Sequence, residues 1–119
     1  MTISLREIQD QVGITNGEKG FNKIDTYPPE YQVDYIAKKL LLSVGEISYE
    51  AFEELRDGHD PLERYYGEGG KPEGFPAEIA DAVIRLLGIA YELKIDLQEV
   101  IEEKMDFNAG RPALHGRKF

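Results

Sequence analysis

Apolar residues recur every three or four positions along most of the chain, which is the spacing of amphipathic helices. The longest such run extends from about residue 30 to 57 and contains one glycine, Gly45. It predicts one long helix, with Gly45 as the candidate site of a bend. A second run begins after Pro76, which suits a first helical position, and predicts a buried helix through Lys94. The apolar positions of the two runs are Val33, Ile36, Leu40, Val44, Ile47, Ala51 and Leu55, then Ile79, Val83, Leu86, Ala90 and Leu93.

The first 29 residues predict a short helix followed by a loop. Ser4 and Glu7 have the spacing of a capping box, and Gly13 suits the end of a helix. Residues 13–29 then carry three glycines and two prolines without a sustained period. A loop is therefore expected there.

Glycines, prolines and capping residues also predict a turn at residues 58–75 and a last helix after Asp96. Residues 58–75 contain five glycines and two prolines, so the chain should turn there between two antiparallel helices. A single helical turn is expected within this segment at the stretch PLERYY. Asp96 and Glu99 repeat the capping-box spacing and predict a last helix, which Gly110 ends.

No segment alternates with the period of a β-strand. The predicted fold class is therefore all-α, a bundle of four or five helices. The length fits a single domain over residues 1–119. Within it we expect an N-terminal helix and loop at 1–29, a bundle core at 30–110 and a basic tail at 111–119.

Charge and cysteine content narrow the function classes. The formal net charge of −9 argues against binding of a long nucleic acid by a broad basic face. Cysteine is absent, which excludes disulfides, thiolate metal sites and cysteine nucleophiles. The N-terminus shows no basic segment followed by an apolar stretch, and no apolar run approaches the ~20 residues of a membrane span. These features predict a soluble cytoplasmic protein without a membrane partner.

Two pairs of acids lie at the edges of the predicted apolar stripes. Glu46 and Glu50 are four apart, and Glu78 and Asp81 are three apart, so each pair lies on one helical face. On spacing alone, solvated surface charges are the simpler interpretation. The position at the stripe edges favours a paired or metal-bound role, because clustered carboxylates on facing helices build Mg²⁺ or Mn²⁺ sites. With only two histidines in the chain, a histidine-rich transition-metal site is disfavoured.

Three segments together resemble the MazG-like, all-α nucleoside triphosphate pyrophosphohydrolases. They read GEISYEAFEELRDG, KPEGFPAEIADAVIRLLGIAYELKIDLQEVI and EKMDFNAGRPALHGRKF. Members of that family carry E-E-x-x-E on one helix and E-x-x-D on the next. The second motif matches at Glu78 and Asp81. The first matches at Glu46 and Glu50, with Ile47 where the family often has its second glutamate.

The resemblance covers residues from about 33 to 119 and implies a metal-dependent hydrolase. By resemblance, Mg²⁺, or Mn²⁺ in its place, would bridge the carboxylates and a triphosphate. Water would then attack the α-phosphorus and release a nucleoside monophosphate and pyrophosphate. The implied catalytic and metal-binding residues are Glu46, Glu50, Glu78 and Asp81. How many metal ions bind, whether Glu53 or Glu54 joins from the next turn, and which acid accepts the water proton all stay open.

The C-terminal end of this acidic chain is basic. Its last sixteen residues hold four basic side chains against one acid. Lys104 and Asn108 lie on one face of the last predicted helix and Arg111 follows its end, so these three could converge on phosphate oxygens. The simpler alternative is that Lys104 and Arg111 offset the helix dipole. Lys118 in the tail and Asn16 in the early loop are further candidate substrate-binding residues.

The same sequence leaves two alternative functions open and predicts a homodimer. A helical interaction module with a structural metal is the alternative from a different class. Another phosphohydrolase, releasing orthophosphate, is a third interpretation. We also expect at least a homodimer, because the long helix presents more apolar length than the shorter helices cover. The candidates for that interface are Tyr31, Tyr35, Leu41, Leu42 and Phe52.

Overall fold

The computed structural model describes residues 2–112, and α-helices make up most of that range. These helices are α1 (Leu5–Glu18), α2 (Pro29–Arg56), α3 (Phe75–Glu92) and α4 (Leu97–Ala109). A small antiparallel hairpin of β1 (Tyr65–Tyr66) and β2 (Pro72–Glu73) connects α2 to α3. Two 3₁₀ turns, η1 (Ile24–Thr26) and η2 (Glu68–Gly70), lie in the connections. The predicted all-α helical class is confirmed.

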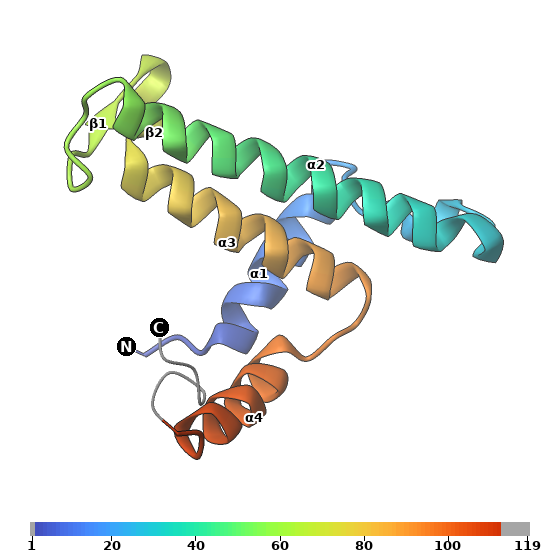
Figure 1. Ribbon diagram of the computed structural model, residues 1–119. Helices are drawn as coiled ribbons and strands as arrows, with labels where there is room; N and C mark the ends of the chain where they lie inside the picture. Colours follow the sequence, from blue (N-terminus) through green and yellow to red (C-terminus); the bar gives the residue numbers. More distant parts are fainter. Residues whose placement is uncertain (1, 113–119) are drawn as a thin grey trace.

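The two long helices α2 and α3 run side by side and antiparallel, with the hairpin at one end of the pair (Figure 1). Helix α2 continues through Gly45 without interruption. Its most buried apolar side chains are Ile47 and Ala51, and those of α3 are Leu87, Ile89 and Ala90. Ile47, Ala51 and Ala90 lie on the predicted apolar stripes, and their burial stabilises the helix packing. The stripe predicted for α3 is otherwise wrong, because Leu87 and Ile89 are buried in place of the exposed residues Ile79, Val83, Leu86 and Leu93.

Helix α1 crosses α3 at a very short distance (Figure 1). Gly13 lies at this crossing, where an added Cβ would sit 2.1 Å from the Tyr91 ring. Gly88 of α3 faces α1 in the same way, since a Cβ there would lie 2.7 Å from the Asn16 amide. The prediction that Gly13 ends the first helix is therefore wrong. The helix continues to Glu18, because Gly13 is used for close packing rather than as a stop.

The connection between α2 and α3 also differs from expectation. The predicted helical turn at residues 61–66 is wrong, because Tyr65 and Tyr66 form β1 and pair with β2. Gly69 and Gly70 have positive φ angles, of 69° and 80°, and reverse the chain between the two strands. Glycine adopts this left-handed conformation at little cost. The strand was missed because two residues are too few to show an alternating pattern.

Helix α4 packs against α1, beyond the α1–α3 crossing (Figure 1). Its N-cap is Asp96, whose carboxylate accepts from the Glu99 amide as the capping-box spacing predicts. The Ser4 hydroxyl caps α1 in the same manner. Within residues 2–112, no helix combines the length and the apolar composition that crossing a membrane requires.

Candidate metal and nucleotide site

The first turn of α3 brings Glu78 close to the acids of α2, at the hairpin end of the helix pair. The Glu78 Oε2 atom is buried and has no hydrogen-bond partner within the described residues. Burial is the main cause that raises the pKa of Glu78 to about 7, and the neighbouring Glu50 carboxyl adds to it. Asp81 and Glu54 contribute in the same direction. Glu50 and Asp81 are therefore close enough to Glu78 to act on its charge.

Glu54 is a further carboxylate in this group. Its side chain is only 15% exposed. One oxygen accepts a hydrogen bond of 2.8 Å from the Tyr65 hydroxyl, which raises the pKa of Tyr65 to about 12. The other oxygen is buried without a hydrogen-bond partner in the described chain, although the His59 Nε2 atom lies 3.8 Å away. The sequence left open whether Glu53 or Glu54 joins the metal ligands. Of these two, Glu54 is the one whose charge acts on Glu78.

Glu46 lies at the margin of the group. Its side chain is 61% exposed, and one oxygen lies 3.8 Å from the Arg85 guanidinium. Asp81 is exposed as well and lines a cavity between the helices. Among residues 2–112, no three acids or histidines already converge on a single point. The carboxylates are neighbours rather than a closed cage.

This donor set nevertheless fits a hard divalent cation. All its donors are carboxylate oxygens, which Mg²⁺ prefers. The buried oxygens of Glu54 and Glu78 lack the hydrogen bonds that buried polar atoms normally make. Mutual repulsion also disfavours the charged form of Glu78, and a bound cation would relieve it. Which residues would hold the ion stays a prediction.

A cavity of about 540 Å³ adjoins Asp81 and is bounded by α1, α2, α3 and the loop after α1. Three cationic side chains line it, Lys23, Lys39 and Arg85. The exposed ring of Phe21 and the Asn16 amide belong to its walls, so Asn16 lies where a ligand could reach it. This volume lies within the range of small-molecule sites.

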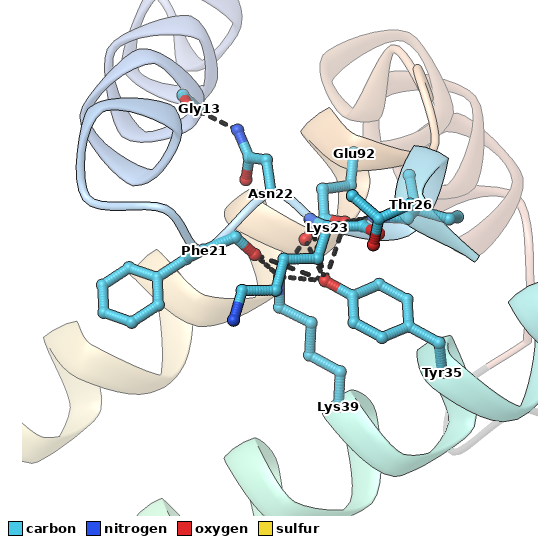
Figure 2. A network of polar contacts seen from close by, with 9 residues as sticks. Gly13, Phe21, Asn22, Lys23, Thr26, Tyr35, Lys39 and Glu92 are labelled. Atoms are coloured by element: carbon cyan, nitrogen blue, oxygen red, sulfur yellow. Dashed lines mark hydrogen bonds and ion pairs between the residues drawn. The ribbon is translucent and has the colours of Figure 1, made fainter.

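A buried ion pair fixes one wall of this cavity (Figure 2). The Glu92 side chain is 1% exposed and accepts from the Lys39 ammonium and, at 2.9 Å, from the Tyr35 hydroxyl. Lys39 also donates to the Phe21 carbonyl at 3.1 Å. The Ile24 amide donates to Glu92 at 3.2 Å. The loop after α1 is thereby tied to both long helices.

Sequence reasoning missed Lys39 and Glu92. Their partnership joins residues 53 positions apart, which no local spacing reveals. The one available signal was the position of Glu92 between Ala90 and Leu93 on an apolar stripe. A charge at such a position needs a partner because an isolated buried charge is very costly.

The predicted phosphate-binding residues in and after α4 lie apart from this cavity and from the acids. Lys104, Asn108 and Arg111 are exposed, and the Arg111 guanidinium lies 4.8 Å from the centre of the Phe107 ring. Helix α4 packs against α1, away from the hairpin end where Glu50 and Glu78 lie (Figure 1). Within residues 2–112 of a single chain, Lys104, Asn108 and Arg111 therefore do not lie beside the acids of α2 and α3. Lys118 lies outside the described residues.

Comparisons of this chain with family models, with curated proteins and with solved structures find no match. The resemblance in the acidic motifs is therefore neither supported nor refuted by these comparisons.

Proposed function

We propose that this chain is a Mg²⁺-dependent nucleoside triphosphate pyrophosphohydrolase. One observation carries the proposal. Asp81 belongs to the carboxylate group of α2 and α3, and it also lines the cavity that holds Lys23, Lys39 and Arg85. An anionic ligand in that cavity would extend from the cations toward the acids.

The walls of the cavity suit the different parts of a nucleotide. Lys23 and Arg85 would bind phosphate oxygens, with Arg85 able to bind in a bidentate manner. Phe21 would stack on the base, and the Asn16 amide would hydrogen-bond to its edge. Lys39 would add positive charge while holding the wall in place through Glu92.

The carboxylates would hold the cation beside the phosphates. The proposed ligands are Glu50, Glu78 and Asp81, with Glu46 or Glu54 completing the set. When bound, Mg²⁺ supplies charge neutralisation and polarisation of the phosphate oxygens. Hydrolysis at the α-phosphorus would yield a nucleoside monophosphate and pyrophosphate, and one of these acids would accept the water proton.

The test is a panel of canonical and modified NTPs and dNTPs incubated with Mg²⁺, with all products resolved. We expect at least one substrate to give its monophosphate and pyrophosphate. Orthophosphate with a nucleoside diphosphate as the sole products would contradict attack at the α-phosphorus. No turnover of any substrate would favour a helical interaction module instead.

Matched variants connect the activity to the carboxylates. Glu50→Gln and Asp81→Asn keep side-chain shape but remove the charge that a hard cation requires, so each should abolish most turnover. Glu30→Gln, in the exposed first turn of α2, removes the same charge away from the site and should retain activity. Equal losses in all three variants would show that overall charge, not the site, is responsible.

We also propose that the chain forms a homodimer. Its accessible surface is 9238 Å², against about 6,500 Å² for a compact monomer of this mass. The radius of gyration is 17.1 Å, where about 13.5 Å is typical of 119 residues. The excess surface is about 2,700 Å² per chain, or about 5,400 Å² for two chains, which lies at the upper end of what obligate dimers bury in total.

The exposed face of α2 is the proposed contact. Leu42, Gly45, Tyr49 and Phe52 are spaced by three and four residues, the pattern of a helix-packing seam. The three large side chains are all more than half exposed. Tyr35 is not part of this face, because its hydroxyl bonds to Glu92 and its ring stacks on Tyr27 at 4.9 Å.

Other expectations from the sequence stay predictions. They are the role of Lys104, Asn108 and Arg111 in binding phosphate, the cytoplasmic location, and the exclusion of long nucleic acids as ligands. The net charge of −9 is the support for the last of these.

A further inference from the structure

A second cavity of about 540 Å³ lies on the other side of residues 22–25 from the proposed nucleotide cavity. Helix α1, η1 and the junction of α3 and α4 enclose it. It shares none of its lining residues with the nucleotide cavity. Part of its wall is apolar, formed by Ile24, Tyr91 and Ile95. Such a space is far larger than a single water needs, about 30 Å³, and is suited to a small organic molecule.

Two amide side chains in this wall have oxygen atoms that accept no hydrogen bond within residues 2–112. Gln9 is 6% exposed, and its Oε1 atom is buried without a partner in the described residues. The Oδ1 atom of Asn22 is in the same condition. Buried polar atoms are nearly always paired, so two orphaned acceptors in one wall require an explanation.

The orientation of both amides is fixed by their nitrogen atoms. The Gln9 Nε2 atom donates to the Ile95 carbonyl at 2.7 Å. The Asn22 Nδ2 atom donates to the Gly13 carbonyl at 2.9 Å, and Figure 2 shows its oxygen turned away from that bond. Rotating either amide would lose these bonds and place its oxygen against another acceptor. Both amides are therefore held in one orientation, and their oxygen atoms stay unsatisfied within residues 2–112.

The charges around the cavity have the sign that attracts a cation. Arg6 is held by Asp96 through bonds of 2.9 to 3.2 Å, and Glu92 is held by Lys39, so these four charges are paired. Among the remaining lining residues, Asp10 and Asp25 oppose Lys94 alone. Neither Asp10 nor Asp25 makes an ion pair within residues 2–112.

We propose that this cavity binds a small organic cation, an amine or amidine whose N–H groups donate to Gln9, Asn22 and the nearby carboxylates. The apolar wall would cover the body of the ligand, and Asp10 and Asp25 would balance its charge. The site does not depend on the proposed hydrolase function. Glu92 lines it while holding Lys39 of the nucleotide cavity, so the two cavities share one buried ion pair.

Benzamidine is a suitable probe, because it combines a flat apolar ring with a cationic group of four N–H donors. Calorimetric titration of the whole protein should show saturable binding at one site. Benzyl alcohol, similar in size but uncharged, should bind at least tenfold more weakly. Equal binding of both would show that the cavity takes any apolar molecule, and absence of saturable benzamidine binding would show that it holds only water; either overturns the proposal.

Variants locate the binding. Asp10→Asn combined with Asp25→Asn changes two exposed residues, so folding should be kept, and benzamidine affinity should fall at least fivefold. Glu103→Gln combined with Asp106→Asn removes the same charge from exposed positions of α4 outside the cavity and should leave affinity unchanged. Equal losses in both pairs would mean attraction to the acidic protein as a whole and would refute the site. Gln9→Met, checked by its melting curve, should weaken binding further if its oxygen accepts from the ligand, and unchanged binding in a folded Gln9→Met protein would count against this contact.

Discussion

The partly buried carboxyl of Glu78 should make the metal-free protein sensitive to pH. Its pKa is raised from the usual 4.5 to about 7 in the folded chain, so the folded state holds this proton more tightly than the unfolded state does. This contribution to stability is fully present below about pH 4.5 and is lost as pH rises through 7. In EDTA, the melting temperature should therefore decline between pH 5 and 8 more steeply in wild type than in Glu78→Gln.

The control for this pH effect is Glu30→Gln, an exposed acid of the first turn of α2. Its melting temperature should follow the wild-type pH dependence, because general charge effects are common to both proteins. Parallel curves for wild type and Glu78→Gln would show that Glu78 titrates normally.

The ion pair of Lys39 and Glu92 should be expensive to break. Removing the ammonium by Lys39→Met leaves a carboxylate that is 1% exposed without its countercharge. Such a change typically costs about 3–5 kcal/mol of unfolding free energy. Replacing both residues, Lys39→Met with Glu92→Leu, removes the uncompensated charge and should recover part of that loss. Urea denaturation of the three proteins measures both values, and a single variant as stable as wild type would mean that water reaches Glu92.

At the scale of elements, the contact between α1 and α3 depends on a missing side chain. Gly13→Ala would place a methyl group 2.1 Å from the Tyr91 ring, so the helices would have to move apart. Overpacking of this kind costs about 1–3 kcal/mol, which should outweigh the better helix propensity of alanine. Thermal or urea unfolding would measure the loss.

A double-mutant cycle distinguishes this clash from other effects of Gly13→Ala. In a Tyr91→Ala background the ring is gone, so Gly13→Ala should cost little or even stabilise the helix. The same loss in both backgrounds would place its cause outside the contact with Tyr91.

The long helices could be predicted from the sequence because their information is local. The expected run of about 30 to 57 closely matches α2, since its apolar positions repeat with the period of a helix. The proximity of Glu50 and Glu78 joins two helices, so local spacing does not give it; it is expected only from the stripe-edge positions of the acids and the family resemblance. The role of Gly13 could not be predicted, because it is set by Tyr91, a residue 78 positions away. The pairing of Lys39 with Glu92 is equally non-local, so the sequence predicts phosphate-binding cations at the C-terminal end rather than in the cavity beside Asp81.

At the scale of the whole molecule, the exposed seam of α2 should control assembly. Light scattering at micromolar concentration should report a dimer for wild type. Leu42→Lys combined with Phe52→Lys places charges on the seam and should give a monomer, because a buried unpaired ammonium is costly. Leu62→Lys is the control, since Leu62 is 85% exposed in the turn after α2 and lies outside the seam. A wild-type monomer, or a dimer that survives both seam charges, would contradict this interface.

The hydrogen bond from the Ile24 amide to Glu92 has a consequence for dynamics. The segment around Ile24 has the composition of a mobile loop, yet this amide donates to one of the most buried carboxylates in the described chain. Its exchange with deuterated solvent should therefore be slow and should report on opening of the Lys39–Glu92 pair rather than on loop fluctuation. Lys39→Met should accelerate exchange at Ile24 far more than at the exposed amides of α4. The loop would then serve as a built-in reporter on the ion pair that separates the two cavities.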